Sequence, residues 1–202
     1  MEITVRQAQR SDIPTLGRVL GLAFADDPIV TWLLPDAASR ARRAATMFTT
    51  VARHNYFEHG GIDVAVDDSG DLVGVAMWAP PGHSSEHTNL RALSGLIRAF
   101  RGRLFAAGRM AEKMAAEHPH DPPHWYLASI GTLPATRGKG YGKALLSARL
   151  DRCDAEGLPA YLESSKPENV PYYERFGFEV TAELDATEGG PLMWKMWREP
   201  RS

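Results

Sequence analysis

Hydrophobic and polar positions repeat with two different periods along the chain, and the period changes several times. Alternation with a period of two predicts a first strand around Ile3 and Val5, followed by strands over residues 62–66, 72–78, 125–133, 160–164, 178–184 and 192–197. Apolar residues at helical spacing predict helices over residues 12–23, 36–56, 89–117, 138–156 and 169–176. Strands and helices are therefore interleaved, which predicts an α/β or α+β protein with a mixed sheet.

Turn residues refine this outline. Residues 67–71 are Asp-Asp-Ser-Gly-Asp and join two strands, which predicts an antiparallel hairpin. Gly102 and Gly108 interrupt the helical stretch from Asn89 to Glu117, which favours two shorter helices there. No repeat or long linker divides the chain, so we expect one domain over residues 1–202.

Composition and charge exclude several classes of protein. The 202 residues include 23 basic and 25 acidic ones, and a net charge of -2 argues against a dedicated nucleic-acid binder. The single cysteine, Cys153, excludes a disulfide framework and a multi-thiolate metal site. No apolar run approaches the roughly 18 residues of a membrane span, and the first residues contain no apolar signal segment. We therefore expect a cytoplasmic protein that does not bind membranes.

The most informative chemistry lies between the strand at 125–133 and the helix that follows it. Gly138, Gly140 and Gly142 alternate there with Lys139 and Tyr141, between Arg137 and Lys143. Glycine permits positive φ and close approach of the backbone to a ligand. Successive N–H groups at a helix start bind anions, and the three flanking cations add positive charge. The segment predicts a diphosphate site, although neither the P-loop nor the dinucleotide glycine pattern fits it.

The spacing Arg137-x-x-Gly140-x-Gly142 instead resembles the pyrophosphate loop of the GNAT acyltransferases, which bind acetyl-CoA. A second stretch, Tyr172-Tyr173 followed by Gly177-Phe178, is similar to the family segment in which a Tyr-bearing helix precedes Gly-Phe and a strand. Within the superfamily, the sequences at residues 23–28, 125–131 and 159–165 resemble the puromycin N-acetyltransferase subgroup.

The resemblance implies a GNAT fold: a central, mostly antiparallel twisted sheet of about seven strands flanked by helices, with two inserted helices before the cofactor-binding strand. It also implies direct transfer of an acetyl group from acetyl-CoA to a primary amine of a small molecule, puromycin-like or other, through a ternary complex. A protein acetyltransferase for lysine or N-terminal amines, and a non-catalytic acyl-CoA sensor, remain alternatives. A pocket closed by the helices at residues 89–117 would favour a small molecule, and an open groove would favour a protein.

For acetyl-CoA, the resemblance implies backbone contacts from the cofactor-binding strand and the glycine loop. A backbone N–H near Thr132 or Leu133 is the candidate donor to the reacting carbonyl oxygen. Many family members place an Asn where this chain has Lys166, and Asn169 could serve instead or simply cap the short helix. The candidate cofactor residues are Ile130, Gly131, Thr132, Arg137, Gly138, Lys139, Gly140, Tyr141, Gly142, Lys143, Asn169 and Tyr173.

Two residues are candidates for acid–base catalysis. Glu163 lies within a short strand, and burial there would raise its pKa toward the range of a general base, acting directly or through a water. It could equally be a structural carboxylate. Tyr173 is the candidate acid that protonates the departing thiolate, with Tyr172 as its rival and a packed aromatic as the structural alternative.

For the acceptor amine, the candidates are Asp26 and Asp27 at the end of the first helix, and Trp125 as part of an aromatic slot. Turn formation before Pro28 explains the two aspartates equally well. His118 and His124 match no zinc spacing, so we expect no metal. The acceptor, the acyl-chain preference and the choice between monomer and homodimer are left open.

Overall fold

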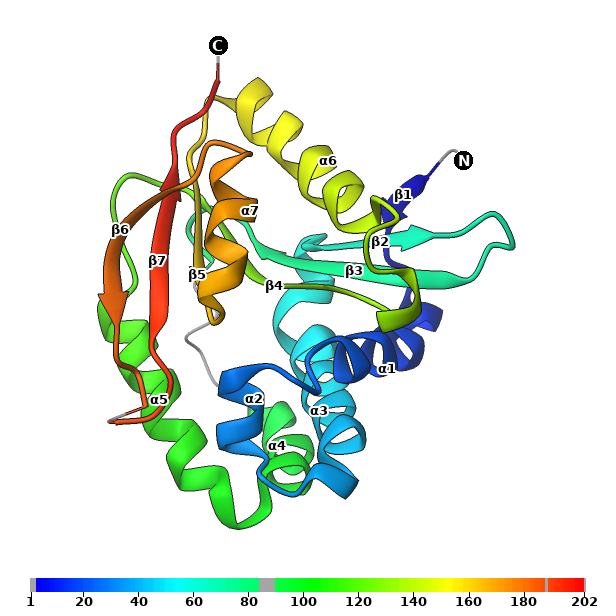
Figure 1. Cartoon of the computed structure of the whole chain (residues 1–202), viewed down its shortest axis with the longest axis vertical. Coiled ribbons are helices and arrows are strands. Elements are labelled where there is room, and N and C mark those ends of the chain that lie inside the picture. The colour runs from blue at the N-terminus through cyan, green and yellow to red at the C-terminus, as the bar shows by residue number, and fades with distance from the viewer. Residues whose placement is uncertain (1–2, 84–89, 188, 202) are drawn as a thin grey trace.

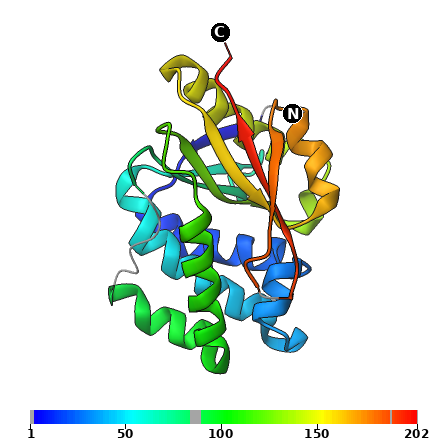
Figure 2. The ribbon, with the colours of Figure 1, turned by 90° about the vertical axis from the view of Figure 1, so that its left-hand side faces the viewer.

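The computed structural model describes residues 3–83, 90–187 and 189–201. It contains a seven-stranded sheet in the order β1-β2-β3-β4-β5-β7-β6, covered by helices on both faces (Figures 1 and 2). Strands β4 and β5 are parallel, and the other neighbouring pairs are antiparallel. The strands are β1 (Thr4–Gln7), β2 (Ile62–Val66), β3 (Leu72–Ala79), β4 (Trp125–Thr132), β5 (Ala160–Ser164), β6 (Glu179–Leu184) and β7 (Met193–Arg198). The predicted mixed α/β fold is confirmed.

The helices divide between the two faces of this sheet. One face is covered by a group of helices that packs around a large apolar core, and the other by two helices over a second core. The first group comprises α1 (Ile13–Ala23), α2 (Pro28–Leu33), α3 (Ala37–Val51), α4 (Leu93–Phe100) and α5 (Leu104–Glu117). The second comprises α6 (Tyr141–Glu156) and α7 (Val170–Glu174).

Helix α2 was not predicted, because Asp27-Pro28 was interpreted as the end of the preceding helix. The structure shows that the same residues begin a new one. The Asp27 carboxylate accepts a hydrogen bond of 3.0 Å from the backbone N–H of Val30, and Pro28 occupies the first helical position. An aspartate followed by proline is compatible both with a turn that ends one helix and with the start of the next. The sequence alone does not distinguish these two alternatives.

Other boundaries moved by a few residues. The predicted helix over 36–56 begins as expected after Asp36, but it becomes a π-helical turn at Ala52–Tyr56. The predicted pair of inserted helices is confirmed; they are separated at Arg101, whose φ of 49° breaks the helix beside Gly102, whereas Gly108 lies within α5. Asn89, the predicted start of this stretch, lies outside the described residues.

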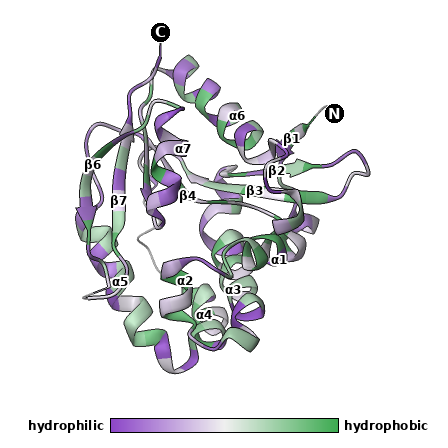
Figure 3. Cartoon of the chain, in the orientation of Figure 1, coloured by the Kyte–Doolittle hydropathy of each residue, from purple (hydrophilic) through white to green (hydrophobic). Residues whose placement is uncertain are grey.

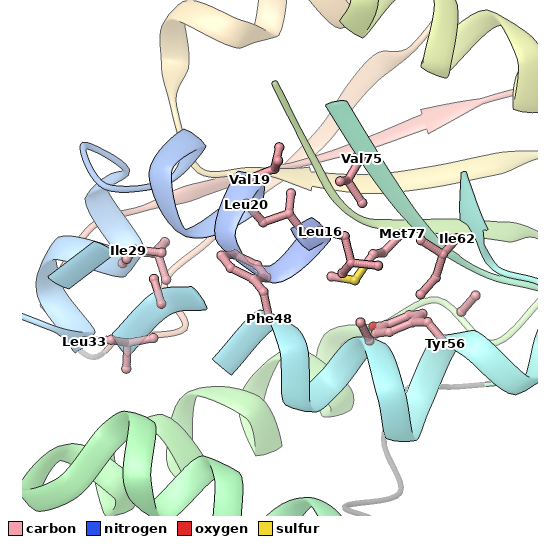
Figure 4. Packing of buried hydrophobic residues seen from close by; sticks show 14 of the residues in the cluster. Leu16, Val19, Leu20, Ile29, Leu33, Phe48, Tyr56, Ile62, Val75 and Met77 are labelled. Carbon is pink, nitrogen blue, oxygen red and sulfur yellow. The ribbon is translucent and has the colours of Figure 1, made fainter. Parts of the chain in front are cut away.

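The larger core joins the helical layer to the sheet. Figure 4 shows Leu16, Leu20, Phe48, Tyr56 and Met77 meeting between α1, α3 and the strands. Figure 3 shows mainly hydrophobic residues along α1 and a mixture of hydrophobic and hydrophilic residues along α3. Within the described residues, no helix combines the length and apolar character needed to cross a bilayer.

Candidate active site

Strands β4 and β5 separate after a short parallel pairing, and this gap forms the centre of the site. Their last paired residues are Leu127 and Leu162, although β4 continues to Thr132. The register of β4 against β3 also shifts beside this point, leaving Ala128 as the extra residue of a β-bulge. Beyond the last pair, the edge of β4 that faces β5 carries backbone groups that pair with no strand among the described residues.

Two cavities open into this gap. The first, of about 310 Å³, lies along β4 and the start of α7. The second, of about 620 Å³, lies beneath the helical layer and is bounded mainly by α2, α3, α4 and α5. They meet at residues that line both: Phe24, Asp27, Ala128, Ser129, Glu163 and Ser165.

The β-ladder determines which backbone groups of β4 face the first cavity. The Leu133 N–H donates a hydrogen bond of 2.8 Å to the Val73 carbonyl, so Leu133 is engaged within the sheet. Because hydrogen-bonded positions alternate along an antiparallel pair, the groups of Thr132 and Ile130 point away from β3, toward the gap. Leu133 is therefore wrong as an oxyanion donor, whereas Thr132 has the required orientation.

Gly131 allows α1 to approach this strand closely. A Cβ atom added at Gly131 would lie 2.8 Å from the Ala23 Cβ and 3.1 Å from Phe24, which is tighter than real contacts. The end of α1 is consequently held against the cofactor-facing part of β4. Ile130, Gly131 and Thr132 all line the first cavity.

The glycine loop lies at the N-terminus of α6. Gly138 and Gly140 have φ values of 79° and 92°, which only glycine adopts readily. Arg137, Lys139 and Lys143 are exposed around it, and Arg137 also lines the first cavity. Open backbone amides, the start of a 16-residue helix and three cations fit a diphosphate.

Two loop residues differ in what they can offer to a ligand. The Tyr141 side chain is buried in the core beneath α6, so only its backbone N–H can contribute to an anion site. Gly142 faces the Tyr172 hydroxyl, which would lie 3.4 Å from an added Cβ atom. An added Cβ atom at position 142 would therefore make an ordinary van der Waals contact with Tyr172 of α7.

The adjacent aspartates Asp26 and Asp27 have different environments. Asp26 is exposed and lies between two cations, 3.5 Å from Arg137 and 3.1 Å from Lys166. Burial opposes ionisation, but these cations lower the pKa of Asp26 overall. Asp26 lines neither cavity, so the structure does not bring it to an acceptor; it orders the cationic rim of the first cavity.

Asp27, in contrast, is 4% exposed and lies where the cavities meet. Its carboxylate accepts hydrogen bonds from the Val30 N–H and the Ser165 hydroxyl. Burial raises the pKa of Asp27 despite these hydrogen bonds. No local sequence pattern links Asp27 to Ser165, because 138 positions separate the two residues.

Glu163 also lies at the junction, on the face of β5 that points to the helical layer. Burial raises the pKa of its carboxyl group, while the phenols of Tyr126 and Tyr161 and the ammonium of Lys195 act in the opposite direction. A carboxyl group with a raised pKa, open to both cavities, has the location and proton affinity of a general base.

Tyr173 and Asn169 line the first cavity from α7 and the turn before it. Burial, with the nearby Tyr172 and Asp27, raises the pKa of the Tyr173 phenol, so it keeps its proton. Asn169 occupies the N-cap position of α7, but its side chain makes no capping hydrogen bond. The capping alternative thus does not account for this side chain.

Trp125 lies on the other face of the sheet from the acceptor cavity. Its indole N–H donates a hydrogen bond of 2.9 Å to Glu156, and Arg149 lies 4.6 Å from the ring centre. Side chains alternate along a strand, so the neighbouring Tyr126, and not Trp125, faces the acceptor cavity. The assignment of Trp125 to an acceptor slot therefore does not fit the structure.

The predicted loop histidines join an aromatic cluster. His118 and His124 lie with their Nε2 atoms 3.2 Å apart, beside Tyr126, Tyr161 and Trp197. Across the described parts of the chain, no group of three or more His, Cys, Asp or Glu side chains is arranged to hold a metal ion.

Comparisons with known proteins agree with this geometry. Residues 28–178 match the acetyltransferase (GNAT) family. An uncharacterized N-acetyltransferase of Schizosaccharomyces pombe is 29% identical over 187 residues, which covers 87% of this chain and 74% of that protein. A solved structure from Corynebacterium glutamicum, described as histone acetyltransferase HPA2 and related acetyltransferase, has a TM-score of 0.76 and 28% identity, covering 100% of this chain and 98% of that one.

A polyamine N-acetyltransferase of Drosophila melanogaster shares the fold, with a TM-score of 0.64 at 15% identity over 98% of this chain and all of that one. The chain thus belongs to the acetyltransferase (GNAT) family. It is a GNAT-type N-acetyltransferase, from a family that uses acetyl-CoA as co-substrate and acts on small-molecule or peptide amines.

Proposed function

We propose that this protein transfers the acetyl group of acetyl-CoA directly to the primary amine of a small, largely apolar molecule. The observation that carries the proposal is the meeting of the two cavities at Asp27 and Glu163. One cavity leads to the glycine loop and the other ends among apolar side chains. Two substrates held in them would meet beside two buried carboxyl groups, as a ternary complex requires.

Bound acetyl-CoA supplies an activated thioester, and the chain positions it. The backbone amides of residues 138–143, with Arg137, Lys139 and Lys143, hold the diphosphate. The free edge of β4 at Ile130 and Thr132, with Asn169 opposite, holds the arm that carries the thioester. A β4 N–H that points into the gap stabilises the negative charge that develops on the carbonyl oxygen.

The side chains where the two cavities meet bind the amine and transfer the protons. Asp27 attracts the acceptor's ammonium group, and Glu163, directly or through a water, accepts a proton so that the neutral amine can attack. Tyr173 keeps its proton at neutral pH because its pKa is raised, and donates it to the departing thiolate. Tyr173 acts in the protonated form that its environment favours, whereas Asp27 and Glu163 must be ionised, which their raised pKa values restrict to higher pH.

The size and lining of the second cavity favour a small acceptor. At about 620 Å³ it falls within the range of small-molecule sites, and α4 and α5 cover it. Its wall includes Met47, Met77, Met110, Met114 and Met193, whose flexible side chains adapt to irregular ligands. This supports an acceptor of the puromycin-like kind, an apolar body with one primary amine.

Thiol release from acetyl-CoA tests the proposal when it is followed with puromycin, simple arylalkyl and alkyl amines, and a set of lysine and N-terminal peptides. We expect turnover with at least one apolar small amine and much slower turnover with peptides. Turnover with peptides alone would indicate a protein acetyltransferase. Binding of acetyl-CoA without turnover on any amine would indicate a sensor.

The glycine loop provides a prediction with a matched control. Gly138 and Gly70 have φ values of 79° and 83°, and both would place an added Cβ in open space. Gly138→Ala and Gly70→Ala should thus lower stability by a similar ~1–2 kcal/mol. Only Gly138→Ala should weaken acetyl-CoA binding, by about tenfold or more, because the amides it orients lose alignment. Calorimetric binding checks this; equal affinities in the two variants would contradict the assignment.

The acceptor cavity provides a second prediction. Gly108 lines it from α5, and a Cβ atom added there would meet no atom within 4 Å. Gly108→Leu should therefore leave the protein folded, raise helix stability by about 0.5–1 kcal/mol, and fill part of the cavity. We expect the KM for a bulky amine to rise at least tenfold with an unchanged KM for acetyl-CoA.

Gly102→Leu is the control for this variant, because Gly102 is equally open but does not line the cavity. It should leave both KM values unchanged. If Gly108→Leu also leaves the KM for every bulky amine unchanged, the acceptor does not bind in this cavity.

A further inference from the structure

One polar group stands out in the apolar wall of the acceptor cavity. Asn55 lines this cavity, and its Oδ1 atom is buried without a hydrogen-bond partner among the residues that the structure describes. A buried amide oxygen left unpaired destabilises the folded protein, because it has lost its hydrogen bonds to water and gained none in return. Few such groups persist in folded proteins unless a ligand or a bound water completes them.

The backbone explains why Asn55 faces the cavity. It belongs to the π-helical turn Ala52–Tyr56 that ends α3. A π-turn inserts a residue into a helix, changes the direction of the side chains that follow, and occurs often at functional sites. The next residue, Tyr56, also lines the cavity and packs beside Met77 and Ile62 (Figure 4).

The position of Asn55 indicates which part of a ligand it would meet. It lines the acceptor cavity but not the cofactor cavity, whereas Asp27 and Glu163 line both. The reacting amine belongs at the junction with these carboxyl groups. Asn55 is thus available to the body of the acceptor, and its neutral amide suits a neutral partner.

We propose that Asn55 determines acceptor specificity by hydrogen bonding to a neutral donor, a hydroxyl or N–H, on the body of the acceptor. The substrate class is then an apolar primary amine that carries such a donor away from its amine. This inference rests on the proposed function. Buried polar groups in a binding site discriminate strongly against ligands that leave them unpaired.

Matched acceptors that differ in one donor test the inference. Suitable pairs are tyramine and phenethylamine, tryptamine and 1-methyltryptamine, and 6-aminohexanol and hexylamine. For at least one pair, we expect wild-type kcat/KM to favour the donor-bearing member by about ten- to a hundredfold. Asn55→Leu, which keeps the branched shape of the side chain but is larger and has no polar atoms, should reduce this ratio to near unity mainly by improving the apolar member.

Two controls keep the outcome clear. Asn169→Leu alters an asparagine that lines the cofactor cavity instead, and should lower activity on both members of a pair equally. Asn55→Ala provides a second variant if Asn55→Leu does not fold. If the wild-type enzyme and the Asn55 variants have the same kcat/KM ratio for every pair of acceptors, the inference is wrong. Absence of turnover with any amine would instead count against the proposed function.

Discussion

Glu163→Gln should lower kcat/KM for an amine acceptor by about 10²–10⁴-fold, the usual contribution of a general base. The amide retains the shape of the side chain but cannot accept the proton. It also removes a buried ionisable group, so the melting temperature should not fall. Acetyl-CoA affinity, measured by calorimetry, should stay within about twofold, because the diphosphate site at residues 138–143 is unchanged.

The pH dependence of kcat/KM tests the same assignment of Glu163 as the general base. Burial raises the pKa of Glu163 above 4.5, and the base must be ionised to act. Wild-type kcat/KM should therefore rise with pH through an inflection above 4.5, and Glu163→Gln should lose this inflection with the same acceptor. Glu183→Gln, at an exposed position of β6, is the control and should match the wild type. Full activity of Glu163→Gln would exclude Glu163 as the base.

Tyr173→Phe should lower kcat by about 10²-fold and leave acetyl-CoA binding nearly unchanged, because only the proton donor is removed. The phenol lies in the cofactor cavity, and its raised pKa keeps it protonated until thiolate leaves. The reduction in kcat should be similar for all acceptors, because the proton transfer to the thiolate follows attack by the amine.

The neighbouring tyrosine is the natural control for this variant. Tyr172 packs against Phe176 and faces the glycine loop without lining either cavity. Tyr172→Phe should keep most of the wild-type kcat. If instead Tyr172→Phe loses activity and Tyr173→Phe does not, the two tyrosines have the opposite roles.

The sequence was informative where local chemistry determines the structure. Gly138 and Gly140 predict positive φ and an open helix start from the sequence alone, and both have positive φ, because few other residues tolerate such a backbone. The order of strands and helices apart from α2, and the break between α4 and α5, followed from period and composition. These features depend on residues that are near one another along the chain.

What the sequence could not give depends on tertiary contacts. Asp26 and Asp27 are equivalent in the sequence, yet one lies at the surface between Arg137 and Lys166 and the other is buried against Ser165. Trp125 was assigned to the wrong face because an apolar run does not show which face of the strand meets the ligand. The acceptor cavity arises from α2, α3, α4, α5, the π-helical turn after α3 and the sheet together, so no local pattern contains it.

The central claim is that both substrates are bound together where the two cavities meet, and initial-velocity kinetics test it most directly. Acetyl-CoA is varied at several fixed concentrations of the best amine, and thiol release is recorded. Direct transfer in a ternary complex predicts double-reciprocal lines that intersect. Parallel lines, together with an acetylated enzyme detected by mass spectrometry in the absence of amine, would show a covalent intermediate and contradict the account.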